Sequence, residues 1–321
     1  MHLSQLKKLH SHYVPQARFA GNRQSVFNLT QTEQGYGVFK KFSEVPAFDW
    51  SERVFVGRGV EIGKRGITVC CEICGSHRSA PVVREAVRCR LCAAVIQGDS
   101  PRHAIISTES GGPEWYPLIV GEDVDRYSAS CRRFIKMGVP GIRYKPIDHF
   151  AAKKLLIRKT GVGLRTAVDE SGSATVQTVF YVVTYSEPDG WLLDYLQGVI
   201  NSRPILAWYL KWSGENQWRS HPYVTPRVVK ELPIADPFAD DYVSSICREI
   251  ATEARRVRRG EAGADYRVDD LVFRLYGLDG VGASWISDAL ADTDDSLEYF
   301  VRMKTSAANG RASEAAPGSS R

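Results

Sequence analysis

Two Cys-x-x-Cys pairs lie in the sequence CCEICGSHRSAPVVREAVRCRLC, between residues 70 and 92. The first pair is Cys71 and Cys74, the second is Cys89 and Cys92, and fourteen residues separate them. The usual separation of such paired knuckles begins at about 15 residues, so this spacing is one residue short. Four thiolates close a tetrahedral zinc site and leave no position for water or substrate. The pattern therefore predicts a structural zinc ion within a small module.

The neighbours of these pairs leave the ligand set open. Cys70 could take the place of Cys71, and His77 follows the first pair by three residues. The four cysteines could also be ordinary reduced thiols in a small core. Cys131 and Cys247 are isolated, and we expect each to be a small buried hydrophobic residue.

The expected compartment supports a metal over disulfides. The first twenty residues lack the apolar core of a signal peptide, and no stretch approaches the roughly 18 apolar residues of a membrane span. We expect a cytoplasmic protein without membrane contact, where thiols remain reduced. The formal charge of +5, from 42 Lys and Arg against 37 Asp and Glu, is compatible with a polyanionic partner without identifying one.

The chain changes from strand patterns to helix patterns near Trp191. Before it, short Val- and Ile-rich runs between glycines indicate strands, with residues 169–173 as the turn of a hairpin. From Trp191 the apolar residues follow helical spacing, and further helices are expected from Pro204, from Asp241 to Gly260, and within residues 266–277 and 284–292. The fold class is therefore α+β, with a β-rich half that carries the four-cysteine zinc knuckle followed by a helical half.

These patterns predict five parts of the chain. The first is expected to be irregular with short strands, the second β-rich with the knuckle, the fourth helical, and the fifth disordered. In chain order, from the first part to the fifth, their bounds are residues 1–52, 53–110, 111–235, 236–304 and 305–321.

No catalytic motif is found in the sequence. There is no phosphate-binding GxxxxGK followed by Ser or Thr, no GxSxG, no HExxH and no GxGxxG after a strand. Residues 236–238, Asp-Pro-Phe, come nearest to the Asn-Pro-Pro-Tyr type of tetrapeptide with which adenine-specific DNA methyltransferases grip a base, but they lack its second proline. We assign no catalytic residue to this chain.

Several segments together resemble one protein family. They are PLIVGEDVDRY at 117–127, KLLIRKTGVGLRTAVDE at 154–170, INSRPILAWYLK at 200–211, WRSHPYVTPRVVKELPI at 218–234 and LVFRLYGLD at 271–279. In this order they are similar to the TaqI-like C-terminal specificity domain, the target-recognition part of adenine-N6 DNA methyltransferases of restriction-modification and phage-defence systems. The resemblance implies that the third part, residues 111–235, is this domain. RGVEIGKRG at 58–66 before a zinc insert resembles a subset of that family.

The resemblance implies double-stranded DNA as a partner and a methyltransferase subunit as another. The β-rich half would be the target-recognition half, and S-adenosylmethionine would lie only on the partner subunit. The chain would be a separate specificity polypeptide or one part of a split or truncated gene. The alternative is a zinc-containing adaptor that binds protein without binding DNA.

Two polar segments are the candidate DNA contacts. The first is a strand and its following turn, where a run of cations without acids suits phosphate, although lysines on a solvated strand edge look the same. The second is a loop in which Asn, Gln and Arg, the side chains that read adenine and guanine, lie between tryptophans, although such a loop can also simply pack. The residues are Lys153, Lys154, Arg158, Lys159 and Arg165 in the first segment, and Lys211, Asn216, Gln217, Arg219, Ser220 and His221 in the second.

The acidic segment GEDVDRY favours a structural role. Glu122, Asp123 and Asp125 would be repelled by phosphate, so we expect Arg126 to be their internal ion-pair partner.

Overall fold

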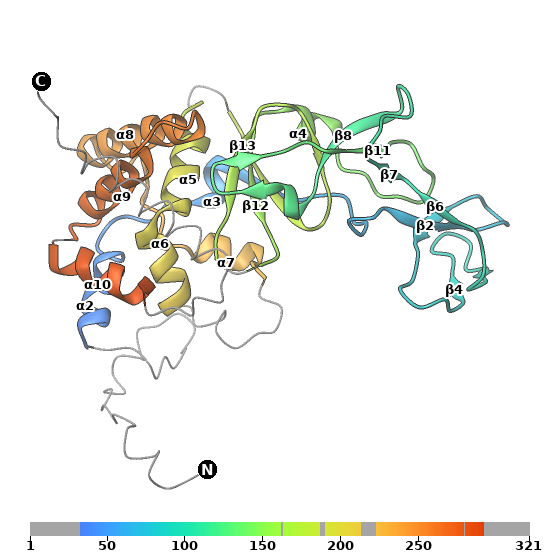
Figure 1. The fold of residues 1–321 in the computed structure, drawn as a ribbon, viewed down its shortest axis with the longest axis horizontal. Coiled ribbons are helices and arrows are strands. Elements are labelled where there is room, and N and C mark those ends of the chain that lie inside the picture. The colour runs from blue at the N-terminus through green and yellow to red at the C-terminus, as the bar shows by residue number, and fades with distance from the viewer. Residues whose placement is uncertain (1–32, 162, 187–189, 213–222, 279, 292–321) are drawn as a thin grey trace, which may run out of the picture.

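The computed structural model describes residues 33–161, 163–186, 190–212, 223–278 and 280–291. This part of the chain is elongated, with helices at one end, two packed sheets in the middle and a small β-rich module at the other end (Figure 1). The predicted α+β class, with a β-rich half before a helical half, is confirmed.

The central sheet is antiparallel throughout. Its strands are β1 (Val54–Arg58), β15 (Val179–Thr184), β12 (Lys154–Arg158) and β13 (Thr166–Asp169), in that order across the sheet. Leu155 and Ile157 face the helices, whereas Leu156 faces the second sheet, and all three are fully buried. Both faces of the sheet are therefore covered, which accounts for the unbroken apolar run in β12. Strand β1 joins the expected segment 53–110 to strands of segment 111–235.

The second sheet packs on the central one around a shared apolar core. Its order is β14 (Ala174–Thr175), β8 (Trp115–Ile119), β11 (Arg133–Lys136) and β7 (Ile106–Ser107), with β14 parallel to β8. Three further elements are η2 (Gly121–Asp123), which follows β8, the pair β9 (Val124–Asp125) and β10 (Ser128–Ala129), which contacts β13 of the central sheet, and helix α4 (Ile147–Ala151), which contacts β14.

The expected hairpin at residues 169–173 is wrong. Strands β13 and β14 belong to different sheets, so this turn carries the chain from one sheet to the other. The Asp169 carboxylate accepts hydrogen bonds from the backbone N–H and the hydroxyl of Ser171, at 3.0 and 2.6 Å, and fixes the turn. The hairpin is instead formed by β12 and β13.

The helices pack on the face of the central sheet away from the second sheet. Helix α5 (Leu192–Asn201) contacts the sheet, and α8 (Asp241–Arg258) and α9 (Ala264–Leu275) cover α5. Ser202 caps α6 (Arg203–Ala207), which continues as the π-helical turn η3 (Trp208–Trp212), and Gly260, at φ 77°, follows α8 as predicted. Helices α7 (Pro226–Glu231) and α10 (Gly280–Ala291) complete this half.

Two helices, which we did not expect, lie in the described residues before 54, whereas residues 42–49 between them are irregular, as expected. They are α2 (Glu33–Lys41) and α3 (Trp50–Arg53). Two glycines weaken the helical pattern of α2, but Phe39 is buried and its ring lies 5.2 Å from that of Trp285 on α10. Tertiary packing outweighs the poor local propensity of this segment.

The module at the other end, residues 67–104, is called the cysteine arm below. It contains a three-stranded sheet of β3 (His77–Ser79), β2 (Ile67–Cys70) and β6 (Arg102–Ala104), and a pair of β4 (Val87–Arg88) and β5 (Val95–Ile96). Its own buried apolar core is only Val69, Cys71, Cys89 and Ile96.

Candidate functional site

The four cysteines of the two knuckles come together in the cysteine arm. Their sulfur atoms all lie within 4.8 Å of one another. The Cys71 and Cys92 sulfurs are 3.6 Å apart, as are those of Cys74 and Cys89. The first cysteine of each pair therefore lies next to the second cysteine of the other pair. Zn–S bonds of about 2.3 Å in a tetrahedron place sulfurs roughly 3.8 Å apart. The arrangement therefore fits one four-coordinate metal ion.

The geometry distinguishes the four clustered cysteines from the two alternative ligands, Cys70 and His77. The Cys70 sulfur points to the carbonyl oxygen of Cys71, at 3.8 Å, and lies outside the cluster. His77 Nδ1 is 3.1 Å from the Thr68 hydroxyl, and its ring packs against His103, so His77 also lies outside. The structure thus groups Cys71, and not Cys70, with the other three sulfurs.

The local backbone favours a thiolate at Cys89. The backbone N–H groups of Cys92 and Leu91 hold the pKa of Cys89 to about 6, and the Leu91 N–H lies 3.4 Å from the Cys89 sulfur. Each Cys-x-x-Cys pair is followed by a residue of positive φ, Gly75 at 69° and Ala93 at 61°, which turns the chain back around the cluster. A deprotonated thiol is the form that binds metal.

Lys154 is not a DNA contact in this structure, contrary to the prediction. Its side chain is fully buried, with its ammonium 2.6 Å from the Asp169 carboxylate and 2.6 Å from the Phe150 carbonyl oxygen. Burial lowers the pKa of Lys154, while Asp169 opposes this shift. The prediction failed here because both faces of the central sheet are covered.

Two more cations of the first segment face carboxylates. Lys153 lies 3.1 Å from Glu170 and 3.4 Å from the buried Asp194. Arg165 exposes only 12% of its side chain and lies 3.9 Å from Asp125. These contacts brace the fold, which is a different role from the predicted contact with phosphate.

Arg158 and Lys159 lie where β12 leaves the core. Arg158 Nε donates to the carbonyl oxygen of Thr160 at 2.8 Å, and Gly161, at φ 108°, begins the turn. Thr160 forms an antiparallel bridge with Tyr223, and the Val224 N–H donates to the Lys159 carbonyl oxygen at 2.7 Å. The Lys159 ammonium lies 5.9 Å from the centre of the Tyr223 ring. Residues 158–161 and Tyr223 are called the recognition edge below.

The recognition edge links the turn of the first predicted segment to Tyr223, which follows the second predicted segment in sequence. Lys211 is half-buried in η3, and Asn216, Gln217, Arg219, Ser220 and His221 lie outside the described residues. Tyr223 is the first described residue after them, and it pairs with the turn of the first segment. No sequence signal indicates this pairing, because a bridge between residues 160 and 223 leaves no periodic pattern.

The acidic segment is structural, but its partner differs from the predicted one. Arg133 contacts Glu122 and Asp123, each at 2.5 Å, and Lys64 reaches Glu122 at 2.9 Å. Arg126 instead donates to the carbonyl oxygen of Asn201 at 2.8 Å. Glu122 and Asp123 are thus tied to β11, whereas Asp125 accepts a hydrogen bond from the backbone N–H of Arg126 at 2.9 Å and lies 3.9 Å from Arg165.

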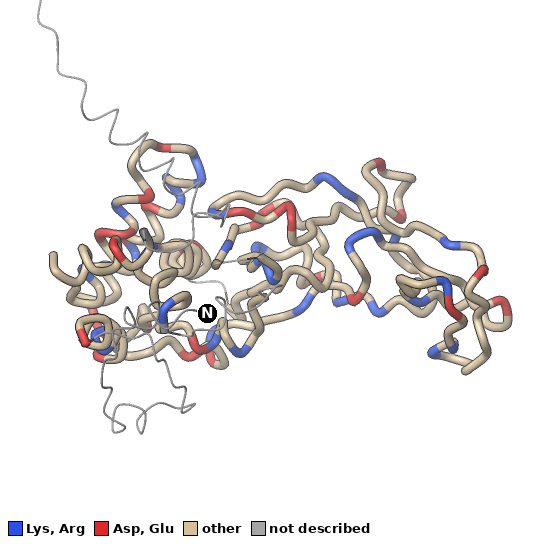
Figure 2. Tube along the Cα trace, turned by 60° about the horizontal axis from the view of Figure 1, so that its bottom comes forward, with Lys and Arg blue, Asp and Glu red and all other residues tan. Residues whose placement is uncertain are grey.

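The basic end of α8 is also occupied by internal contacts. The buried Asp194 of α5 lies 3.0 Å from Arg255 and 2.5 Å from Arg258. Figure 2 shows acidic positions beside basic ones along this helical part. These two arginines therefore tie α8 to α5.

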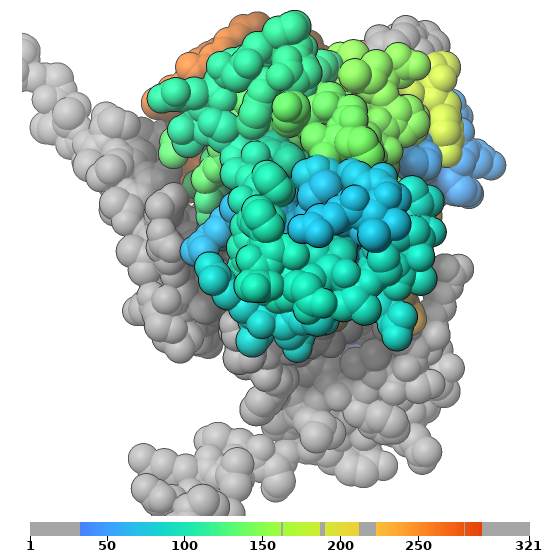
Figure 3. Space-filling view, turned by 90° about the vertical axis from the view of Figure 1, so that its right-hand side faces the viewer, coloured from blue at the N-terminus to red at the C-terminus, as the bar shows by residue number. Residues whose placement is uncertain are grey.

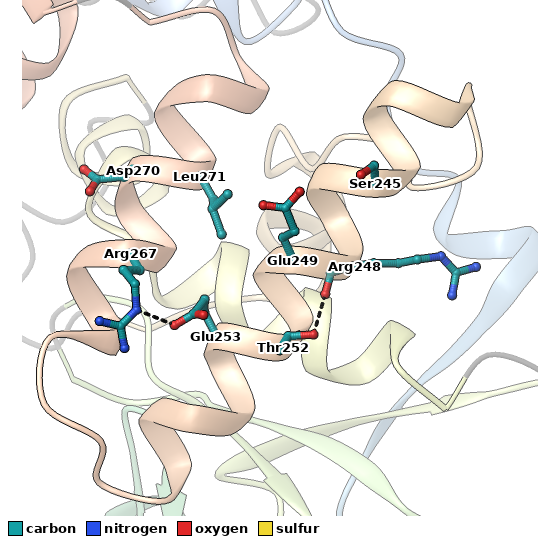
Figure 4. A pocket seen from close by; sticks show the side chains of 8 residues that line it. All are labelled: Ser245, Arg248, Glu249, Thr252, Glu253, Arg267, Asp270 and Leu271. Carbon is teal, nitrogen blue, oxygen red and sulfur yellow. Dashed lines mark hydrogen bonds and ion pairs between the residues drawn. The ribbon is translucent and has the colours of Figure 1, made fainter.

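An open groove of about 520 Å³ lies between α8 and α9 (Figure 4). Glu253 on its wall holds Arg267 at 2.7 Å and Arg256 at 2.8 Å, and Leu271 projects from the opposite helix. The residues that line this groove include no histidine or cysteine.

Comparison with known families gives one match. Residues 116–234 match the TaqI-like C-terminal specificity domain, which suggests a DNA-recognition role in methyltransferase systems. The matched part begins in β8, ends after α7 and includes the recognition edge, whereas the cysteine arm lies before it. No curated protein matches the chain. None of the helices in the described residues is long and apolar enough to cross a membrane.

Proposed function

We propose that the chain recognises a specific sequence in double-stranded DNA for an adenine-N6 DNA methyltransferase of a restriction-modification or phage-defence system. It acts as a specificity subunit or as the recognition part of a split enzyme, in the cytoplasm, and the partner subunit binds S-adenosylmethionine. The observation that carries this proposal is that the part resembling a specificity domain contains the recognition edge, where the turn of the first candidate segment pairs with Tyr223, which follows the second candidate segment in sequence.

The recognition edge is suited to binding DNA because it follows directly from a buried strand that keeps it in a fixed position. Leu155, Leu156 and Ile157, which precede it in β12, are fully buried between two layers. Cations fixed at the end of such a strand can meet phosphates without a large loss of side-chain entropy, and a glycine turn lets the backbone approach the duplex.

The metal in this proposal is zinc with a structural role. Cys71, Cys74, Cys89 and Cys92 fill a tetrahedral coordination sphere, so the ion would organise the cysteine arm and take no part in a reaction.

A binding experiment with the full chain tests the proposal. A duplex selected from a random library should bind tightly. A plot of the logarithm of its affinity against the logarithm of the salt concentration should have a slope of about −0.9 for each phosphate contacted. The same protein with duplex and labelled S-adenosylmethionine should transfer no methyl group. Absent or salt-insensitive binding would favour the zinc-containing adaptor, and methyl transfer by this chain alone would contradict a specificity subunit.

A further inference from the structure

The end of helix α5 contacts strand β13, which begins after the turn that carries the recognition edge. Asn201 is the last residue of α5, and only 1% of it is exposed. Its side-chain oxygen accepts a hydrogen bond from the Thr166 N–H at 3.0 Å, and its side-chain amide donates one to the Thr166 carbonyl oxygen at 2.9 Å. One side chain therefore satisfies both main-chain groups of the first residue of β13.

These hydrogen bonds lie on the outer edge of the central sheet. Across the hairpin of β12 and β13, the Arg158 N–H donates to the Arg165 carbonyl oxygen at 3.0 Å. Alternate residues of an antiparallel pair direct their main-chain groups to the partner strand, so the next residue, Thr166, directs its own away from β12. Strand β13 is the last in its sheet, and outward groups of such a strand need partners from elsewhere. Asn201 supplies them with an amide that has the donor and the acceptor of a peptide group, and the Tyr127 N–H adds a bond of 2.9 Å to the Thr166 oxygen.

The main chain around Asn201 is fixed to two other elements. Arg126, which follows β9, donates to the Asn201 carbonyl oxygen at 2.8 Å. Two residues further on, the N–H and the Nε of Arg203 donate to the buried Asp269 of α9, at 2.7 and 2.5 Å. Asn201 is therefore held by the helical half, and it fixes the start of β13 relative to that half.

The hydrogen bond between Arg158 and Arg165 extends this constraint to the recognition edge. Arg165 directly precedes Thr166, so a fixed Thr166 also fixes the carbonyl oxygen to which the Arg158 N–H donates. The guanidinium of Arg158 lies along the turn, with its Nε 2.8 Å from the Thr160 carbonyl oxygen. A shift of β13 would therefore move Arg158 and the turn beside it.

Lys159, the other cation of the recognition edge, has separate anchors. Its N–H donates to the Thr178 carbonyl oxygen at 2.9 Å, and its own carbonyl oxygen accepts from the Val224 N–H at 2.7 Å. Neither bond involves β13 or α5. The positions of Arg158 and Lys159 therefore depend on different contacts.

We infer that Asn201 is a positioning residue for DNA recognition, which fixes the start of β13 so that Arg158 is directed to a phosphate of the duplex. This inference rests on the proposed function and deepens it, because it makes one contact of the recognition edge depend on a buried residue that touches no DNA.

The salt dependence of binding to the selected duplex tests the inference in variants of the full chain. Arg158→Ala should reduce the salt slope of the unmodified chain by about 0.9, because it removes one phosphate contact. Asn201→Ala alone should reduce the slope by about the same amount, and adding Arg158→Ala to it should then change the slope little. Lys159→Ala should reduce the slope by about 0.9 in both backgrounds, because its anchors remain.

Ser202→Ala is the matched control for Asn201→Ala. Ser202 is also fully buried where α5 meets α6, and its hydroxyl donates to the Val199 carbonyl oxygen at 2.7 Å. In this background Arg158→Ala should keep its full effect. The Thr166 amide should exchange with solvent faster in Asn201→Ala and not in Ser202→Ala. Asn201→Ser, whose hydroxyl is too short to reach Thr166, takes the place of Asn201→Ala if that variant does not fold.

Arg84→Ala is the matched control for Arg158→Ala. Arg84 is exposed on the cysteine arm, which lies in front in Figure 3 with no other described segment over it. Whatever change Arg84→Ala makes to the salt slope of the unmodified chain, it should make the same change in the Asn201→Ala background.

The outcomes separate this inference from the proposed function. A full effect of Arg158→Ala in the Asn201→Ala background, or no effect in the unmodified chain, would overturn the inference, and the contact of Lys159 would stand. If Lys159→Ala also lost its effect, or if Ser202→Ala behaved like Asn201→Ala, Asn201 would act on the fold as a whole and would not position Arg158. If the unmodified chain binds no duplex, the proposed function fails and the inference fails with it.

Discussion

At the scale of single residues, position relative to the sheet decides what a lysine can do. Lys159 follows the last residue of β12, with its backbone bound to Thr178 and Val224 and its ammonium near the Tyr223 ring. Its side chain is half-exposed, so it can reach a phosphate while the main chain stays fixed. Such a contact adds affinity without reading bases.

The first prediction contrasts Lys159 with Gln217. Lys159→Ala should weaken binding to cognate and single-base-variant duplexes about equally and reduce the salt slope by about 0.9, because it removes one phosphate contact. Gln217→Ala or Arg219→Ala should cost about 1–3 kcal/mol on the cognate duplex and relax the choice of one base pair, because paired hydrogen bonds to a base edge are lost.

Affinities measured at one fixed salt concentration for the whole set of duplexes distinguish these effects. Arg227→Ala serves as the matched control for Arg219→Ala, since Arg227 is exposed on α7 and paired with Glu231 at 2.7 Å. A uniform loss for Gln217→Ala would make its loop a backbone clamp and place base recognition elsewhere.

The run of basic residues from 153 to 165 shows what sequence can and cannot predict about this site. The charge pattern correctly located a strand and its turn, but it treated Lys154 like Lys159. Lys154 is enclosed because a second sheet covers the face to which it points, and Asp169 supplies its counter-charge. Whether a strand residue such as Lys154 is enclosed depends on how the two sheets pack on each other, and the sequence of one strand does not determine this packing.

At the scale of elements, the cysteine arm depends on its cysteines for cohesion. Its apolar core contains Val69, Cys71, Cys89 and Ile96, and two of these four carry the clustered sulfurs. A core this small cannot offset the conformational entropy of the arm, so the proposed metal would supply the missing folding free energy.

The second prediction concerns the metal. Protein purified without chelators should contain one zinc ion per chain, and Cys74→Ser should release it, because serine offers no thiolate. Amide hydrogen exchange should then become fast in β2 to β6 while the central sheet stays protected. Cys70→Ser is the matched control and should retain the ion, since its sulfur lies outside the cluster. Elemental analysis that finds no zinc would remove the assignment.

Local patterns predicted some elements well and others poorly. The knuckles and α5 follow from short-range spacing, and both were found where the sequence indicated them. Helix α2 was missed because its stability comes from packing against Trp285, far away in sequence. The hairpin at residues 169–173 was misassigned because turn chemistry at Asp169 is the same whether the next strand joins the same sheet or another.

At the scale of the whole molecule, one buried carboxylate links the sheet to the helices. Asp194 on α5 contacts Lys153, which precedes β12, and both Arg255 and Arg258 near the end of α8. Its side chain is 2% exposed, and these three cations, together with the N-terminal end of α5 in whose first turn it lies, compensate its charge. The contact fixes the helical half relative to the strand that ends in the recognition edge.

The last prediction follows from this link. Asp194→Ala should lower the free energy of unfolding by about 3–5 kcal/mol, because it leaves neighbouring cations without their buried counter-charge. Asp270→Ala, on the exposed side of α9, is the matched control and should change it by less than about 0.5 kcal/mol. Urea unfolding followed by circular dichroism measures both. DNA affinity of Asp194→Ala should fall as well, since Lys153 and β12 lose their anchor to α5. Equal stability of the two variants would show that the sheet and the helices are held together by apolar packing alone.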